Sequence, residues 1–288
     1  MTNTTPQYHA PLVIKYLNDA DYSETHTAMS ARTLERIRLA KEGISTPDEL
    51  WIVEHNDVYT LGQAGKESHI LRRTDTPIIK TDRGGQVTWH GRGQLVVYYL
   101  FDLKSLGWGV RDLVSHAEQA IEDVINTYLQ SADDNALKAD SAAIVNAESP
   151  QHLYDRSNYG YYAKARKDAP GVYVYARAAA NQALNQSAHT SVQTDEPTTE
   201  TVIDASDIML GKIASLGFKI KHGMSYHGIA VNLTCDLSAF LAINPCGYEG
   251  MTMLRLSDFL AIDYQQVTEA LIANISARHQ GQIALRAT

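Results

Sequence analysis

The sequence predicts an α+β fold, in which strands of a mixed sheet are covered by a few long helices. Three segments carry apolar residues at helical spacing, and seven shorter segments are rich in β-branched and aromatic residues. The predicted strands are grouped along the chain and do not alternate strictly with the helices, which argues for α+β.

The predicted helices come first, because their periodicity is the clearest signal. They are expected at Thr25–Ala40, Val110–Gln130 and Tyr264–Arg278. The middle helix has an apolar stripe at Leu113, Val114, Ala117, Ile121, Val124, Ile125 and Tyr128. The last helix repeats this spacing at Val267, Leu271, Ile272 and Ile275.

The predicted strands lie between these helices. They are expected at Leu50–Glu54, Ile78–Thr81, Gln94–Phe101, Gly171–Tyr175, Lys212–Leu216, Phe218–His222 and Tyr226–Leu233. Apolar and polar residues alternate across Phe218–His222, which indicates a strand with one exposed face.

Length and composition favour one catalytic domain spanning residues 1–288, with an insertion at about 178–210. The range Ala178–Leu210 has five acidic residues and no Lys or Arg. Such a composition buries too little apolar surface to order itself, so we expect a disordered or mobile surface insertion that is dispensable for chemistry. The stretch Ser131–Ser157 is expected to be a milder version.

The first residues, Met1–Gln7, lack the features of a signal peptide, and no apolar run approaches the length of a membrane span. A cytoplasmic location is therefore expected. The two cysteines, Cys235 and Cys246, should stay reduced there, with Cys235 packed at the end of a strand. A zinc site from these cysteines with His222 and His227 is disfavoured, because paired ligand spacing is missing.

Cys246 lies between Pro245 and Gly247 in the run Ile243–Gly250. A proline stiffens the chain before the thiol, and a glycine lets a substrate approach the backbone. Taken alone, a cysteine in a turn is more often a packed residue than a nucleophile. Two motifs earlier in the chain make this thiol a candidate nucleophile.

The first of these motifs is a glycine-rich segment, Arg83–Gln94, between two predicted strands. So many glycines indicate close approach of a ligand, or backbone that needs positive φ. Neither G-x-x-x-x-G-K-[ST] nor G-x-G-x-x-G occurs, and a strand follows, so a nucleotide-phosphate site is disfavoured. A plain hairpin turn is the alternative, although the segment is longer and more charged than such a turn requires.

The second motif, Gly211–Gly217, places Lys212 among Ile, Ala, Leu and Gly. Lysine usually extends its amine to water, which would make Lys212 an ordinary surface residue. A buried amine could instead act as a base near neutral pH, or as a cation that stabilises a neighbouring thiolate.

These motifs together resemble those of the lipoyl(octanoyl) transferases, cysteine enzymes that move an octanoyl group from acyl carrier protein to a lysine of a lipoyl domain. Arg83–Gly91 resembles the substrate-binding loop of that family, Lys212–Gly217 its lysine motif and Asn244–Gly247 its nucleophile motif. The similarity extends, with interruptions, over about 50–251.

The resemblance implies a biotin/lipoate protein ligase-like fold, with a mixed sheet flanked by helices. It implies an acyltransferase that forms an octanoyl-cysteine thioester intermediate, in the first step of endogenous protein lipoylation. The implied donor is octanoyl-acyl carrier protein. The implied acceptors are the lipoyl domains of 2-oxoacid dehydrogenase E2 subunits and the glycine cleavage H protein. No cofactor, metal, nucleic acid or membrane partner is expected.

The resemblance also implies residue roles. Cys246 is expected to be the nucleophile, and Lys212 to activate it and later accept a proton from the acceptor lysine. A backbone N–H near Cys246, such as that of Gly247, is expected to hold the oxyanion. Substrate-binding residues are expected at Arg83, Gly84, Gly85, Gln86, Val87, Thr88, Trp89, His90, Ser215, Leu216, Gly217, Gly228, Ile229 and Ala230.

Three residues of the glycine-rich segment leave alternatives open. Arg92 stands where the family usually has proline, and Trp89 where a smaller ring is commoner, so the stiffness of the loop and the shape of the pocket wall are open. His90 either orients the lysine or contacts the acyl group, or it is a hydrogen-bonded loop histidine.

The net charge of −8 opposes the approach of acidic carrier proteins, so a local basic patch is expected. An ordinary solvated surface is the alternative. The candidate residues are Arg72, Arg73, Lys80, Arg83, Arg92, Lys219 and Lys221.

Two other functions are compatible with the same fold. An ATP-dependent lipoate ligase would activate its acid as an adenylate and would need no nucleophilic cysteine. A non-catalytic acyl-binding or carrier-domain-binding protein would form no covalent intermediate.

Overall fold

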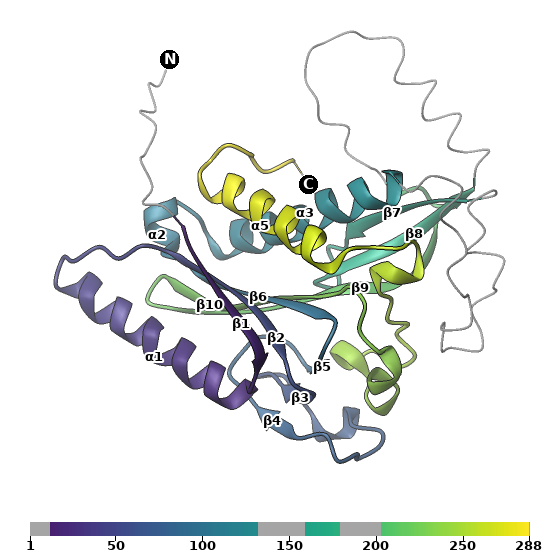
Figure 1. The fold of residues 1–288 in the computed structure, drawn as a ribbon, viewed down its shortest axis with the longest axis horizontal. Helices are drawn as coiled ribbons and strands as arrows, with labels where there is room; N and C mark the ends of the chain where they lie inside the picture. The colour runs from purple at the N-terminus through teal and green to yellow at the C-terminus, as the bar shows by residue number, and fades with distance from the viewer. Residues whose placement is uncertain (1–11, 132–158, 179–202, 288) are drawn as a thin grey trace, which may run out of the picture.

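The computed structural model describes residues 12–131, 159–178 and 203–287, which form two sheets and their covering helices (Figure 1). The larger sheet has seven strands in the order β1-β2-β6-β10-β9-β8-β7, and the smaller has three in the order β4-β3-β5. In the larger sheet, β1 and β2 are parallel and the other neighbouring pairs are antiparallel. The predicted mixed sheet of an α+β fold is confirmed.

The strands of both sheets are β1 (Val13–Ala20), β2 (Glu49–His55), β3 (Val58–Leu61), β4 (Ile78–Lys80), β5 (Val87–His90), β6 (Gln94–Leu100), β7 (Tyr159–Ala165), β8 (Val172–Ala178), β9 (Ile208–Lys221) and β10 (Met224–Asn232). The α-helices are α1 (Tyr22–Lys41), α2 (Leu103–Leu106), α3 (Val110–Ser131) and α5 (Tyr264–His279). Short 3₁₀ turns are η1 (Glu67–His69), η4 (Leu237–Ala242), η5 (Pro245–Gly247) and η6 (Leu256–Asp258).

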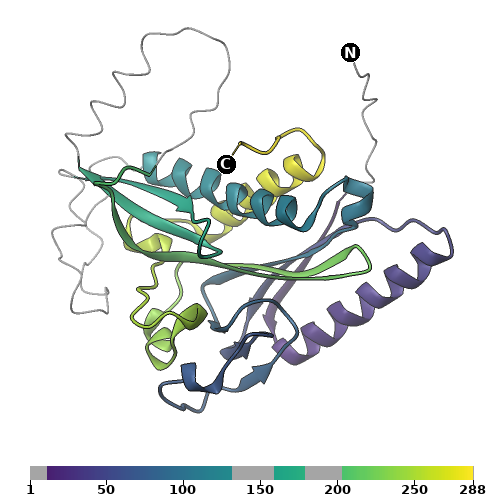
Figure 2. The ribbon, with the colours of Figure 1, turned by 180° about the vertical axis from the view of Figure 1, so that it is seen from behind.

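Helices cover both faces of the large sheet, as the two opposite views show (Figures 1 and 2). The main core lies between the sheet and α3 with α5, whose apolar stripes are buried there. On the other face, α1 packs through Met29 onto residues of β2, β6 and β10. The small sheet lies below this second face and shares a separate core with η4.

The three long predicted helices are all present, at α1, α3 and α5. The two strands predicted at Lys212–Leu216 and Phe218–His222 are one continuous strand, β9. The predicted break at Gly217 was wrong, because Gly217 pairs with Gly228 of β10 in regular antiparallel register. The strands β1, β3, β5 and β7 were not predicted.

The range predicted as an insertion is too wide at both ends. Ala178 is the last residue of β8, and Ile208 is the first residue of β9. The Asp207 carboxylate accepts a hydrogen bond of 2.6 Å from the Tyr162 hydroxyl and pairs with Arg177 at 2.7 Å. This acid is therefore part of the ordered sheet edge, while 179–202, like the stretch 132–158, lies outside the described residues.

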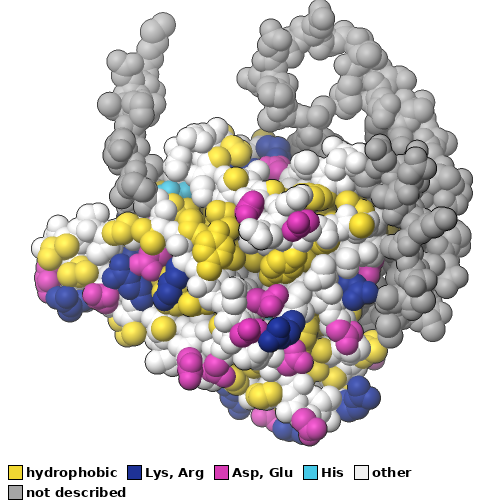
Figure 3. Space-filling view, viewed as in Figure 1, with side chains coloured by type: hydrophobic (Ala, Val, Ile, Leu, Met, Phe, Trp, Pro, Cys, Tyr) yellow, Lys and Arg dark blue, Asp and Glu magenta, His cyan; other side chains and the backbone are white. Residues whose placement is uncertain are grey.

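Figure 3 shows that hydrophobic side chains gather in the middle of one face, while basic and acidic side chains lie side by side around them. In the described part of the chain, no helix combines the length and the apolar character needed to cross a lipid bilayer.

Candidate active site

Cys246 sits in the tight turn η5, with its backbone in the left-handed region at φ 57° and ψ 15°. Hydrogen bonds close the turn on both sides, from Gly247 N to Asn244 O at 3.0 Å and from Tyr248 N to Pro245 O at 3.1 Å. A left-handed conformation is unfavourable for a residue with a Cβ and persists where the surroundings impose it. The turn thus fixes the direction of a partly exposed thiol.

Lys212 lies on β9 at a bulge in its pairing with β8. Val172 pairs with Ala214 and Tyr173 pairs with Lys212, so β9 has one residue more than β8 here. Bulges of this kind redirect side chains, often beside active sites. The Lys212 backbone also bonds to the chain after Cys246, through Lys212 N to Thr252 O at 2.9 Å and Leu254 N to Lys212 O at 2.8 Å.

The bulge brings the amine of Lys212 to the thiol of Cys246. Lys212 is only 1% exposed, which excludes the ordinary surface lysine considered from the sequence. Its Nζ lies 3.0 Å from Cys246 Sγ and donates to Pro170 O at 2.8 Å. The Tyr173 ring centroid lies 5.4 Å from Nζ, within cation–π distance. The amine is therefore held between the Cys246 thiol, the Pro170 carbonyl and the Tyr173 ring.

Gly171 makes room for this amine. It has φ 135°, and a Cβ at this position would lie 2.4 Å from Lys212 Cε. A side chain here would displace Lys212. The local sequence Pro170–Gly171 therefore supplies a carbonyl that accepts from Nζ and a space that Nζ occupies.

The glycine-rich segment is held from inside by Arg83, which is buried. Its guanidinium donates to Thr60 O at 2.6 Å, to Gln86 O at 2.7 Å and to Gly84 O at 2.8 Å. Burial lowers the pKa of Arg83, and its interaction with an ionised Tyr22 or Cys246 opposes that shift. Arg83 thus shapes the loop and is a second cation near the thiol.

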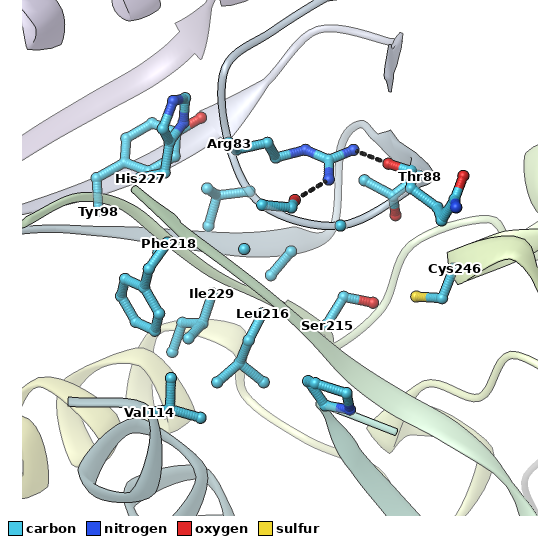
Figure 4. Close-up of a pocket in the computed structure, with 18 of the residues that line it drawn as sticks. Arg83, Thr88, Tyr98, Val114, Ser215, Leu216, Phe218, His227, Ile229 and Cys246 are labelled. Carbon is cyan, nitrogen blue, oxygen red and sulfur yellow. Dashed lines mark hydrogen bonds between the residues drawn. The ribbon is translucent and has the colours of Figure 1, made fainter. Parts of the chain in front are cut away.

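The loop, β9, β10 and α3 enclose a cavity of about 350 Å³ that opens beside Cys246 (Figure 4). Every predicted substrate-binding residue lines it except Trp89: Arg83, Gly84, Gly85, Gln86, Val87, Thr88, His90, Ser215, Leu216, Gly217, Gly228, Ile229 and Ala230. Apolar side chains such as Leu216, Phe218 and Ile229 line the part distant from the thiol.

Trp89 was predicted in the pocket wall but does not line the cavity. It is buried and meets Phe240 edge to face at a centroid distance of 5.5 Å, in the core that the small sheet shares with η4. The absence of a side chain on Gly91 makes room for this ring, because a Cβ on Gly91 would lie 2.1 Å from Trp89 Cζ2. The large ring is therefore accommodated on the side of β5 away from the substrate cavity.

His90 is buried beside the cavity. His90 bonds through Nδ1 to Gln94 Oε1 at 2.7 Å, and burial lowers its pKa well below the ordinary value, so it is a neutral, hydrogen-bonded histidine that also lines the cavity. It makes no hydrogen bond to Lys212 in the described structure.

The backbone N–H of Gly247 was predicted to hold the oxyanion. It already donates to Asn244 O within the turn, so it is not free for this role.

Several residues at the site were not among the predicted site residues. Pro170 contacts the lysine amine, and Val110 and Val114 of α3 line the cavity. Glu118, one turn after Val114 on the same helix, accepts from Gly171 N at 3.2 Å. The only signal for the valines was the apolar stripe of α3, which equally indicates a core helix.

The second cysteine, Cys235, is fully buried, and burial raises its pKa to about 12, as expected for a packed thiol. Both cysteines are free. One group of described side chains, His26, Asp82 and His227, is close enough together to hold a metal ion. Both imidazoles bond Asp82 Oδ1 through Nε2, at 3.0 and 2.9 Å, so hydrogen bonding accounts for this group.

The predicted basic patch is weakened by the structure. Arg83 is buried and cannot be part of a docking surface. Arg73 and Lys80 both pair with Glu67, and Arg92 pairs with Asp19 at 2.6 Å. Three candidates have no ion pair within the described residues: Arg72, Lys219 and Lys221. Of these, Lys219 and Lys221 lie at the end of β9, beside the cavity residue Ile220.

Comparison with known proteins relates this site to a family. Residues 25–276 match the model of the lipoyl protein ligase A/B catalytic domain. The chain is 56% identical to an octanoyltransferase of Psychrobacter arcticus and 53% identical to one of Psychrobacter cryohalolentis, over 99% of this chain and 96% and 98% of those proteins. It is 40% identical to an octanoyltransferase of Acinetobacter baylyi, over 86% of this chain and 82% of that protein.

Solved structures show the same fold at low identity. P. falciparum LipL1 in complex with lipoate superposes with a TM-score of 0.51 at 12% identity, covering 96% of this chain and 65% of that one. The T. acidophilum protein Ta0514 with bound lipoic acid has a TM-score of 0.50 at 13% identity, covering 96% and 88%. With the sequence identities above, these findings show that the chain belongs to the lipoyl protein ligase A/B catalytic-domain family, among its octanoyltransferases.

Proposed function

We propose that this protein is a lipoyl(octanoyl) transferase that uses Cys246 and Lys212 as its catalytic pair. The observation that carries this proposal is the distance of 3.0 Å between Lys212 Nζ and Cys246 Sγ at the edge of an apolar cavity. The relatives named octanoyltransferase support the reaction.

The first half-reaction loads the cysteine. The Cys246 thiolate, stabilised by the Lys212 ammonium, attacks the carbonyl carbon of the octanoyl thioester. The bond from this carbon to Cys246 Sγ forms, and the bond to the donor sulfur breaks. The donor leaves as a thiol after taking a proton from Lys212, which becomes neutral.

The second half-reaction transfers the group to an amine. A lysine of the acceptor attacks the octanoyl-cysteine carbonyl and loses a proton to neutral Lys212. An amide bond forms, and the bond to Cys246 Sγ breaks. Lys212 is then an ammonium beside a thiolate again, so one residue serves both steps.

The cavity accounts for the choice of an acyl chain. Burying the seven carbons beyond the carbonyl contributes roughly 5–6 kcal/mol, at about 0.8 kcal/mol per carbon. The donor is octanoyl-acyl carrier protein, and the acceptors are lipoyl domains of 2-oxoacid dehydrogenase E2 subunits and the glycine cleavage H protein. Lys219 and Lys221 are the residues that would meet these acidic partners.

Intact mass spectrometry after mixing with octanoyl-acyl carrier protein tests the proposal. One octanoyl group should attach to the wild-type protein and to Cys235→Ala, and none to Cys246→Ala. An adduct that persists in Cys246→Ala would contradict the nucleophile assignment. Isotope exchange between ATP and pyrophosphate, which an ATP-dependent lipoate ligase would catalyse, should not occur.

A further inference from the structure

The peptide group between Pro170 and Gly171 is hydrogen-bonded on both sides. Its carbonyl oxygen accepts from Lys212 Nζ at 2.8 Å, and its N–H, on Gly171, donates to Glu118 Oε1 at 3.2 Å. Lys212 Nζ in turn lies 3.0 Å from Cys246 Sγ. A continuous chain of hydrogen bonds therefore joins a carboxylate on α3 to the thiol, through one peptide and one amine.

No ion pair accounts for the partly buried carboxylate of Glu118. It is partly buried and forms no ion pair within the described residues. Its neighbour Glu122, one turn further along α3, is paired with Lys164 at 3.5 Å and Arg286 at 3.0 Å. A carboxylate that is withdrawn from water without an ion pair is costly to keep ionised. Its carboxylate accepts a hydrogen bond from the peptide that contacts Lys212.

We propose that Glu118 is a positioning residue, whose ionised carboxylate polarises the Pro170–Gly171 peptide and so holds the Lys212 ammonium beside Cys246. A carboxylate that accepts from a peptide N–H makes the carbonyl of the same peptide a stronger acceptor, because hydrogen bonds in a chain reinforce one another. This inference rests on the proposed pairing of Lys212 and Cys246, and it adds the group that orients this pair.

The ionisation of Glu118 is sensitive to pH near neutrality. Burial raises its pKa to about 7, and the charge of Glu122 adds to this shift, whereas the Gly171 N–H and Lys212 oppose it. These are the charged groups that act on it from α3 and β9. The hydrogen-bond chain therefore gains strength as pH rises through about 7.

The stability of the fold should change in the opposite direction. Since the pKa of Glu118 in the folded protein lies above its unfolded value, its contribution to stability is full at low pH and is lost as pH rises through about 7. A glutamine at this position is neutral at every pH. We therefore compare the melting temperatures of Glu118→Gln and wild type at two pH values. The difference, variant minus wild type, should be more positive at pH 8.5 than at pH 5.5.

The test measures alkylation of Cys246 by iodoacetamide against pH, followed by intact mass in the full-length protein. Glu118→Gln keeps a hydrogen-bond acceptor but removes the charge, so alkylation at pH 7.5 should slow about fivefold and its rise should move to higher pH. The control is Asp112→Asn on the same helix, whose carboxylate also accepts from a glycine, Gly109 N at 2.7 Å. This variant should alkylate like wild type.

Three outcomes separate the possibilities. If Glu118→Gln alkylates like wild type while Lys212→Met is slowed, the inference on Glu118 is overturned and the proposed function stands. If neither variant is slowed, the pairing of Lys212 with Cys246 fails. Should Glu118→Gln not fold, Glu118→Asp keeps the charge but withdraws it from Gly171 N, and a wild-type alkylation profile in that variant would also overturn the inference.

Discussion

Gly171 and Lys212 are packed so closely that a Cβ on Gly171 would lie 2.4 Å from Lys212 Cε and 2.8 Å from its Nζ. The backbone of Gly171 also has φ 135°, which other residues rarely adopt. The position of the Lys212 amine thus depends on the absence of a side chain at Gly171, just before β8.

Gly171→Ala should reduce octanoyl transfer about 100-fold, because a displacement of about 1 Å in a catalytic group has an effect of that size. The matched control is Gly43→Ala, which also has a positive φ of 77° but has nothing within 4 Å of the added Cβ. Both variants carry the conformational cost, and only the first displaces Lys212. Octanoyl transfer rates measure the displacement of Lys212, and thermal unfolding followed by circular dichroism measures the conformational cost. An equal loss of transfer in both variants would contradict this account.

The sequence predicted the fold well where the signal is local. The helices α1, α3 and α5 were found from apolar spacing, which reflects burial of one helix face. The strand β1 was missed because it lies at the edge of the sheet and most of its residues are exposed, so its pattern is weak. The strand β5 was hidden within a glycine-rich segment, where glycine usually indicates a loop.

The candidate site shows a similar division. The sequence singled out Lys212 and Cys246 because an isolated lysine among apolar residues and a cysteine between Pro and Gly are unusual. It could not show the role of Gly171 or Glu118, because their contacts depend on how β8 and α3 pack beside β9. It also placed Trp89 in the cavity, since spacing in a loop does not tell which side of β5 a ring occupies.

Lys212→Met should fold, because methionine fills a similar apolar volume, but octanoyl transfer should fall by about 10²–10⁴-fold with the loss of the acid–base group. Alkylation of Cys246 at neutral pH should slow as well, since the cation beside the thiol is gone. Lys41→Met, at the exposed C-terminal end of α1, is the control and should change neither quantity. Normal alkylation in Lys212→Met would show that the amine does not act on the thiol.

Acid should destabilise the fold between about pH 6.5 and 4 through buried neutral histidines. Burial lowers the pKa of both His55 and His116 to about 4. Because the folded pKa lies below the unfolded value, the stabilisation is complete above pH 6.5 and is lost as pH falls towards 4.

His116→Phe should reduce this loss, since phenylalanine can still stack on Trp108, whose ring centroid lies 4.0 Å away. Urea unfolding at pH 7.5 and pH 4.5 should show that the variant loses about 1–3 kcal/mol less than wild type between the two conditions. Parallel losses in the two proteins would mean that His116 does not contribute to acid sensitivity.

The length of the cavity should set the preferred acyl chain, and Val114 offers a way to change it. Val114 projects from α3 into the part of the cavity remote from Cys246 (Figure 4). Val114→Trp would fill this part, so the terminal carbons of an octanoyl group would lose their apolar surroundings. Each carbon excluded in this way should lower the rate roughly fourfold, at about 0.8 kcal/mol per methylene.

Transfer rates from hexanoyl-, octanoyl- and decanoyl-acyl carrier protein test this expectation. Val114→Trp should shift the preference towards hexanoyl, with the longer chains losing most. Thr127→Trp adds the same bulk to the exposed side of the same helix, where no cavity residue lies, and should keep the wild-type order of rates. Since neither residue touches the thiol, alkylation of Cys246 should be unchanged in both variants. An unaltered chain preference in Val114→Trp would mean that the acyl group follows a different path from the thiol.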